Sequence, residues 1–249
     1  MASKKIVPAE IQINPRQTKL LFAIIKEFCD TGSYLGSTEL KEKFNFDFSP
    51  ATIRNEFVRL RDMGYLYQPF VNSPSIPTEK AFKLFINQLI LGLSNAAQQQ
   101  SEMREQIMEL TNKHENLNKE ISKLISEQTD LPSFSVSKNS QGVTGMKHLM
   151  ETGASISASN IIEFLENMDT NKKYLLSDQV MQTQGELTTV FGGDSKILPL
   201  SEGYAMIATQ IKIGDEETVI GIISPINKLA DPKAIEVMSS LTRRLGGMN

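Results

Sequence analysis

A short helix predicted to begin at Ser49–Pro50 carries hydrogen-bonding side chains along one side. At 100° per residue its apolar residues form a single stripe: Ile53, Phe57 and Leu60. The opposite side presents Thr52, Asn55 and Arg59, with the small residue Ala51 at its start. Asn can bond adenine bidentately, Thr can contact a thymine methyl group, and Arg can bond guanine or a phosphate. The pattern fits a helix that reads DNA bases, and it fits an ordinary amphipathic surface helix equally well.

Hydroxyl groups and cations near this helix are candidates for contacts to the DNA backbone or the neighbouring groove. The predicted set is Ser37, Thr38, Ser49, Arg54, Arg61 and Lys80. Residues 1–90 contain 12 Lys and Arg against 9 Asp and Glu, a net charge of +3, whereas the remaining residues contain 14 against 20, a net charge of −6. A phosphate-binding domain needs such a local cationic excess, which the whole-chain charge of −3 does not reveal.

Three helices and a hairpin must position these residues. The predicted elements are helices at 15–31, 38–44 and 49–63, a strand at 65–69, a turn-rich stretch at 72–75 and a further helix from Thr78. Asn14 followed by Pro15 is a typical helix start, and Gly32 is a typical stop. This order of elements predicts a winged helix-turn-helix, in which the third helix enters the major groove.

Several motifs in this order resemble the HrcA heat-shock repressor family. They are GS-x-x-L at 36–40, SPATIRNE at 49–56, LxxMGYLYQP at 60–69 and IPTEKAFKLFINQL at 76–89, with weaker similarity at 103–131, 142–150 and 189–245. The resemblance implies a cytoplasmic, dimeric bacterial repressor that binds double-stranded DNA at an inverted-repeat operator upstream of chaperone genes. It further implies that the SPATIRNE helix is the recognition helix, that a GAF-like domain with an inserted dimerising segment follows, and that the chaperonin is a partner.

The chain is predicted to be α+β with three parts: a winged-helix domain at 1–90, a long helical connector at 91–130, and a reduced GAF-like domain at 131–249. The connector carries a heptad seam in which His114 and Gln128 interrupt the apolar positions. The last helix, which begins at Asp231–Pro232, carries a second apolar stripe. The residues predicted to dimerise are Met103, Ile107, Leu110, Leu117, Ile121, Leu124, Met238, Leu241 and Leu245.

The Ser-, Gly- and Pro-rich stretch at 131–146 is predicted to be a linker or exposed loops. The segment between Pro132 and Gly142 is predicted to be too brief to hold the first strands of the family's GAF-like region, so that region is expected to be cut down. Beyond it, the pattern predicts helices at 159–167 and 173–184, a strand pair at 205–213 and 218–224, and a final helix.

Other chemistries find little support in the sequence. The single cysteine, Cys29, excludes an intramolecular disulfide, and two histidines, His114 and His148, cannot complete a Cys/His metal cage. Neither histidine has a paired nucleophile motif, so the chain is predicted not to be an enzyme and to hold no metal or cofactor. The sequence has no apolar run of about 18 residues and no secretion signal. We therefore expect a cytoplasmic location and no membrane partner.

One departure from the family pattern supports an alternative function. The family's wing usually carries a Gly-Arg pair before IPT, whereas this chain has Asn72, Ser73, Pro74 and Ser75. A wing without that Arg lacks a phosphate or minor-groove contact. The alternative is therefore a winged-helix protein-interaction module, or a chaperone-associated scaffold, without sequence-specific DNA binding.

Overall fold

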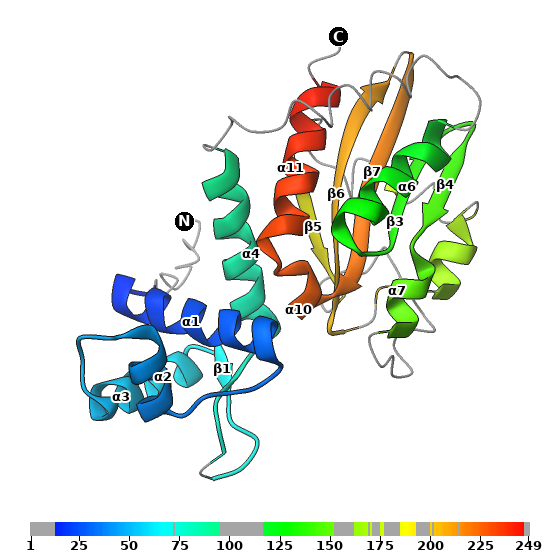
Figure 1. Ribbon diagram of the computed structural model, residues 1–249. Helices are drawn as coiled ribbons and strands as arrows, with labels where there is room; N and C mark the ends of the chain where they lie inside the picture. The colour runs from blue at the N-terminus through cyan, green and yellow to red at the C-terminus, as the bar shows by residue number, and fades with distance from the viewer. Residues whose placement is uncertain are drawn as a thin grey trace, which may run out of the picture. The chain divides into compact units, whose positions relative to one another are not determined.

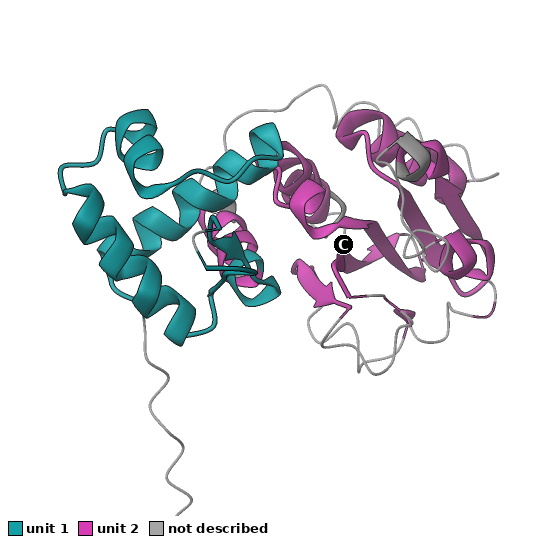
Figure 2. Cartoon of the chain, turned by 90° about the horizontal axis from the view of Figure 1, so that it is seen from below, with its two compact units in different colours: residues 1–82 teal, residues 83–249 magenta. Residues whose placement is uncertain are grey.

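The computed structural model describes residues 13–71, 73–94, 117–151, 162–168, 170, 175–176, 185–192, 200, 202–213 and 215–246. The chain divides into two compact units, Met1–Phe82 and Lys83–Asn249 (Figure 2). Helices dominate the first unit and an antiparallel sheet forms the centre of the second, so the chain is α+β as predicted.

The first unit consists of three helices and a small hairpin (Figure 1). The elements are α1 (Pro15–Thr31), α2 (Ser37–Phe44), α3 (Pro50–Asp62), β1 (Leu66–Tyr67), β2 (Ile76–Pro77) and the start of α4 (Glu79–Ser94). Strands β1 and β2 pair antiparallel, with Leu66 opposite Pro77. The predicted helix bounds agree closely with these elements, because strong caps mark the helix ends.

The caps of α1 show why the sequence predicts its ends so well. Asn14 accepts a hydrogen bond from the backbone N–H of Gln17 at 2.9 Å, and the Gln17 side chain accepts from the Asn14 backbone N–H at 3.0 Å. This reciprocal capping box satisfies two donors that a helix start leaves unpaired. At the other end Gly32 has φ +69°, a left-handed conformation that glycine adopts without a steric penalty.

The second unit is a five-stranded antiparallel sheet with helices on it. Its elements are α6 (Leu117–Thr129), β3 (Ser133–Ser137), β4 (Gln141–Thr144), α7 (Met146–Glu151), β5 (Thr188–Phe191), β6 (Tyr204–Ile213), β7 (Glu216–Pro225), α10 (Ile226–Leu229) and α11 (Pro232–Gly246). The strand order is β4-β3-β7-β6-β5. Helices α6 and α11 contact each other and the sheet, α6 on β3 and β4, and α11 on β6. Alternate residues of β3, β6 and β7 pack with Phe164, Leu165 and Met168 in an apolar core.

The structure corrects the prediction that 131–146 is a linker. This stretch contains β3 and β4, and every residue from Leu131 to Ser137 is buried. Strand β3 alternates Ser with Phe134 and Val136, which belong to the apolar core. The segment between Pro132 and Gly142 is therefore long enough for a strand, and the expectation that it was too brief was wrong.

Serine side chains explain why hydropathy did not reveal β3. Ser135 donates to the side chain of Asn118 on α6 at 2.6 Å, and Asn118 donates to Ser137 at 3.1 Å. Ser133 donates to the backbone carbonyl of Ser122. Because the helix supplies a partner for each hydroxyl, a polar strand face is buried without unsatisfied groups. Composition alone makes such a strand look like a loop.

The predicted dimer residues fall in different places. Met103, Ile107 and Leu110 lie outside the described residues. Leu117 and Leu124 are half-buried on α6, whereas Ile121 on the same helix is buried. Met238 and Leu241 on α11 are also buried, and Leu245 belongs to α11 but its side chain is outside the described part. Ile121, Met238 and Leu241 thus contribute to the interior of the chain's own second unit, since a buried helix stripe and a heptad seam have nearly the same period.

The predicted helix at 159–167 agrees with the helical residues 162–166, and most of the predicted helix at 173–184 lies outside the described residues. Strand β6 ends at Ile213 as predicted, whereas β7 begins two residues earlier than predicted, at Glu216, which pairs with Ile213. In the part of the chain that the structure describes, no helix is both long and apolar enough to cross a membrane.

Candidate nucleic-acid interface

Helix α3 has one buried side and one exposed side. The buried residues are Ile53, Glu56, Phe57 and Leu60, and the exposed residues are Ala51, Arg54, Asn55, Val58, Arg59 and Asp62. The exposed residues recur every three or four positions and therefore share one face. This face brings Asn55 and Arg59 together with Arg54, whereas Thr52 is only half-exposed at its margin.

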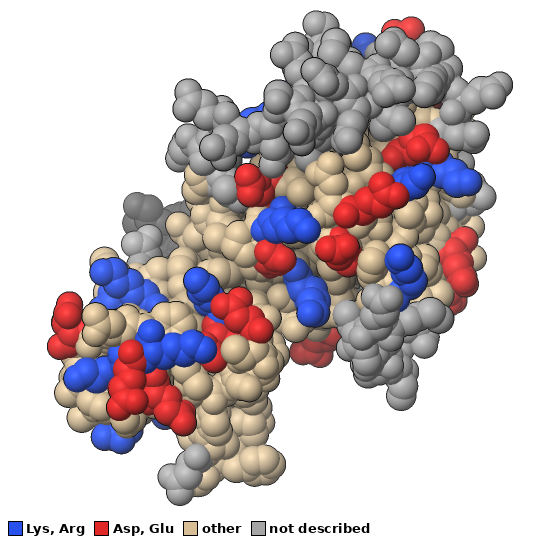
Figure 3. All heavy atoms as spheres, in the orientation of Figure 1, with Lys and Arg blue, Asp and Glu red and all other residues tan. Residues whose placement is uncertain are grey.

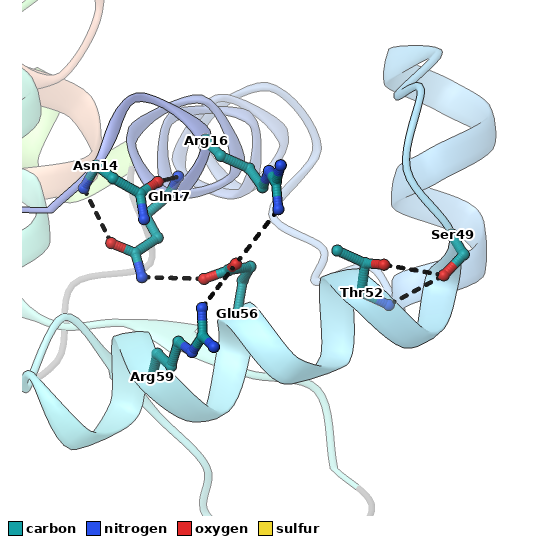
Figure 4. Close-up of polar contacts among 7 residues, drawn as sticks. All are labelled: Asn14, Arg16, Gln17, Ser49, Thr52, Glu56 and Arg59. Carbon is teal, nitrogen blue, oxygen red and sulfur yellow. Dashed lines mark hydrogen bonds and ion pairs between the residues drawn. The ribbon is translucent and has the colours of Figure 1, made fainter.

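A hydroxyl pair fixes the start of α3. Ser49 is the N-cap, and its side-chain oxygen accepts a hydrogen bond from the Thr52 backbone N–H at 3.1 Å. The two hydroxyl oxygens of Ser49 and Thr52 also lie 3.0 Å apart (Figure 4). Ser49 therefore has a structural role, and the hydroxyl of Thr52 already has a partner within the chain. A base contact by Thr52 would use its methyl group or exchange this hydrogen bond.

A buried carboxylate connects α3 to α1. Glu56 is 3% exposed, and it accepts a hydrogen bond from the Gln17 side chain at 2.9 Å. Arg59 donates to the other carboxylate oxygen at 3.2 Å, and Arg16 approaches the same oxygen at 3.8 Å (Figure 4). Buried carboxylates need such partners, because an unpaired charge in the interior is strongly disfavoured. Glu56 thereby links the two helices through its contacts with Gln17 and Arg16.

The same contact orients Arg59. Its side chain is 64% exposed although one guanidinium nitrogen is bonded to Glu56. A guanidinium has five N–H donors, so the remaining donors are available to a ligand. Holding one end of the group reduces the conformational freedom that Arg59 would lose on binding. The geometry therefore favours Arg59 as a pre-oriented donor at the exposed face of α3.

Two other residues predicted to contact the DNA backbone make hydrogen bonds near the end of α3. Arg61 donates to the hydroxyl of Ser75 at 3.0 Å. The Lys80 ammonium donates to the backbone carbonyl of Met63 at 2.9 Å and lies 4.4 Å from the centre of the Tyr65 ring. A cation at a helix C-terminus also stabilises the helix dipole. Both residues thus have structural roles beside the phosphate contacts predicted for them.

The remaining predicted residues lie at the start of α2. Ser37 is buried and Thr38 is exposed. The backbone N–H of Gly36 donates to the Glu39 carboxylate at 2.8 Å, which anchors the first turn. Thr38 therefore remains available to a phosphate near this helix N-terminus, whereas Ser37 is shielded from solvent.

The structure adds three features that the sequence reasoning missed. Arg16 is 55% exposed and lies 5.6 Å from the centre of the Phe48 ring, just before α3 begins. Val58 is 45% exposed in the middle of the exposed side of α3. An aromatic stack, Phe44, Phe46 and Phe48, lines the turn between α2 and α3. The alternating FNFDF pattern was the available signal for this stack, whereas the position of Val58 needed the observed helix face.

Among the described residues, no group of three or more His, Cys, Asp or Glu side chains could hold a metal ion.

Comparison with known proteins indicates the class of protein first: the similar curated proteins are transcription repressors. Heat-inducible transcription repressor HrcA from Alkaliphilus metalliredigens is 33% identical over 139 residues, which cover 56% of this chain and 40% of that protein. HrcA from Clostridioides difficile is 29% identical over 181 residues, covering 72% of this chain and 53% of its own length. HrcA from Natranaerobius thermophilus is 39% identical over 90 residues, covering 36% and 26%.

These comparisons confirm the resemblance to the HrcA repressors that the motifs indicated. The matches cover between about a quarter and about half of the length of these relatives. The relatives are transcription repressors and not enzymes, in agreement with the prediction for this chain. No family model matches the sequence.

A solved structure described as a hypothetical protein at 2.2 Å resolution has a similar fold, with a TM-score of 0.68 and 15% sequence identity. The alignment covers 94% of this chain and 98% of the other. At this identity the likeness concerns the fold alone. It indicates that the succession of helices, hairpin and sheet is not peculiar to this chain.

Proposed function

We propose that the chain is a repressor of heat-shock (chaperone) genes that binds an inverted-repeat DNA operator. The observation that carries the proposal is the exposed face of α3, where Asn55, Arg54 and Arg59 lie together on a helix fixed at both ends. The named role of the similar HrcA proteins supports the same function.

In the proposed complex the first unit acts as a winged helix-turn-helix, with α3 in the major groove and the β1–β2 hairpin as the wing. Asn55 and Arg59 contact base edges, and Val58 packs against a thymine methyl group. Arg54, Thr38 and Arg16 contact phosphates, which hold the helix in register without reading sequence. The Glu56 carboxylate keeps Arg59 in position for this contact.

The second unit is proposed to be a reduced GAF-like domain that serves regulation and dimerisation. Two copies related by a twofold axis would place two α3 helices on the two halves of an inverted repeat. A chaperonin is the proposed regulatory partner, by analogy with the family that the sequence resembles. The function needs no metal, cofactor or membrane.

Fluorescence anisotropy with two labelled duplexes tests this function. One duplex carries the inverted repeat of a chaperone promoter, and the other has the same composition in scrambled order. We expect the full chain to prefer the operator by about a thousandfold or more, with affinity for both duplexes falling as salt increases. Equal, weak and easily salt-abolished binding to both duplexes would contradict the proposal.

A further inference from the structure

The hairpin that follows α3 carries no charge and has an apolar tip. Residues 65–78 contain no Lys, Arg, Asp or Glu. Three of their side chains are strongly exposed: Tyr67 at 57%, Phe70 at 78% and Val71 at 91%. In Figure 3 the surface of this hairpin, below the helices of the first unit, shows neither blue nor red. Exposed apolar groups of this size need an explanation, because their burial elsewhere would be favourable.

Hydrogen bonds connect the described residues Gln68, Phe70 and Ser73 around the tip. The Ser73 hydroxyl donates to the backbone carbonyl of Phe70 at 2.8 Å and accepts from the Phe70 backbone N–H at 3.2 Å. The Ser73 backbone N–H also donates to the Phe70 carbonyl at 3.1 Å. From the strand side, the Gln68 side chain donates to the Ser73 carbonyl at 2.8 Å. Phe70 and Val71 are thus presented on a braced turn.

The base of the hairpin is fixed to the helix that is proposed to read DNA. The Thr78 hydroxyl donates to the Gly64 carbonyl at 2.8 Å, immediately after the end of α3. The bond from Arg61 on α3 to Ser75 makes a second connection between α3 and the hairpin. Any ligand that seats α3 therefore also fixes the direction in which the tip points.

We propose that Phe70 and Val71 form a wedge that enters the minor groove beside each half-site and partly unstacks one base step. The inference rests on the proposed function. Apolar side chains inserted between base pairs from the minor groove are a known way to kink DNA. A tip without cations offers phosphates no charged partner, whereas the arginines of α3 and α1 can supply the attraction to the backbone.

The size of the tip favours DNA over a protein partner. An aromatic side chain buries about 150–250 Å², whereas a stable protein interface buries about 800 Å² on each partner. Two side chains at a narrow turn supply far less than that area, but they suffice to fill one opened base step. The proposal also predicts a preference for a flexible pyrimidine–purine step at the insertion site, because such steps unstack most easily.

Operator duplexes with 2-aminopurine at successive positions beside each half-site test the wedge directly, since this base fluoresces more strongly when unstacked. We expect the full chain to raise the fluorescence at one position per half-site. The double variant Phe70→Ala/Val71→Ala should abolish this rise and weaken operator binding about tenfold or more. Its plot of log affinity against log salt should keep the wild-type slope, because no phosphate contact is lost.

The matched control is Phe70→Leu, which keeps an apolar side chain at the tip and should retain most of the fluorescence rise. Because Phe70 and Val71 are exposed, all variants should unfold at the wild-type temperature. If the double variant keeps both the wild-type operator affinity and the wild-type rise in fluorescence, the wedge is overturned. The proposed function still stands in that case, provided that the chain prefers the operator to the scrambled duplex. Loss of chaperonin binding without loss of DNA binding would equally overturn it, in favour of protein docking. If the wild-type chain does not prefer the operator, both proposals fail.

Discussion

Glu56 shows how one buried carboxylate can link fold and recognition. It accepts from Gln17 on α1 and from Arg59 on its own helix, with Arg16 close by. The sequence marks position 56 only as part of a polar helix. Its partner Gln17 is 39 residues away, and local periodicity contains no information about such a pair. The cap at Ser49 and the stripe of Ile53, Phe57 and Leu60 could be predicted, because they depend on neighbours in the chain.

Replacing Glu56 by Ala should destabilise the first unit. The Gln17 amide would lose its acceptor in a buried place, and two arginines would lose a partner, which predicts a loss of about 1–3 kcal/mol in the free energy of unfolding. Urea unfolding followed by circular dichroism measures this loss. Asp62→Ala is the matched control, since Asp62 is an exposed acid on the same helix and its removal should leave stability nearly unchanged. Equal stabilities for the two variants would contradict the role given to Glu56.

At the scale of elements, helices were easier to predict from the sequence than the sheet. Strands β6 and β7 are apolar and β-branched, and the sequence predicted them as a pair. Strand β3 was missed because every second residue is serine, and its burial depends on acceptors and donors from α6. The apolar hairpin tip was also missed, because exposure of Phe70 and Val71 depends on the turn that Ser73 holds.

The close approach of β4 to α6 leads to a test of the corrected strand region. A Cβ atom added to Gly142 would lie 2.3 Å from the Asn118 backbone oxygen and 2.4 Å from the Lys119 Cα atom. Because backbone atoms of α6 cannot rotate away, Gly142→Ala should destabilise the chain by about 3 kcal/mol, at the upper end of the usual overpacking cost. Thermal or urea unfolding measures this change.

Gly92→Ala is the matched control for that variant. Gly92 lies within α4, and an added Cβ would meet nothing within 4 Å. Alanine in place of a helical glycine should stabilise the chain by about 0.5–1 kcal/mol. If Gly142→Ala were as well tolerated as Gly92→Ala, this result would contradict the close approach of β4 to the backbone of α6.

The hairpin between β3 and β4 gives a pH-dependent prediction. Hydrogen bonds from Ser137 and then Asn139, opposed by partial burial and aided by Lys138, hold the pKa of Glu216 below its ordinary value. A carboxyl group whose pKa is lowered by folding stabilises the folded state above its unfolded pKa, about 4.3. This stabilisation disappears as the pH falls through the lower pKa of the folded state.

Asn139→Ala should therefore raise the pKa of Glu216 toward its ordinary value, and the bond from Ser137 should keep the return incomplete. The variant should unfold more easily than the wild type at pH 7, and the difference should shrink as the pH falls below about 4. Unfolding curves across pH, with a carbon-detected titration of the Glu216 carboxyl, measure both effects. A difference that stays constant down to pH 2 would contradict this role of Asn139.

For the whole molecule, the proposed function requires two copies. We expect sedimentation at micromolar concentration to give twice the chain mass of 27.8 kDa. Leu124→Glu, a change at a half-buried position of α6, should shift the population toward the monomer. Ile121→Ala should lower stability instead, because Ile121 is only 1% exposed within its own chain. A purely monomeric wild-type profile at this concentration would contradict the dimer.

Base discrimination by α3 is the central claim, and one measurement tests it most directly. Wild type and Asn55→Ala are titrated, by anisotropy, against operator duplexes that each differ at one base pair of the half-site. The account predicts that wild type discriminates at one adenine by about 1–3 kcal/mol and that Asn55→Ala loses discrimination at that pair alone. Identical base preferences for both proteins, with affinity reduced equally on every duplex, would contradict a recognition role for the exposed face of α3.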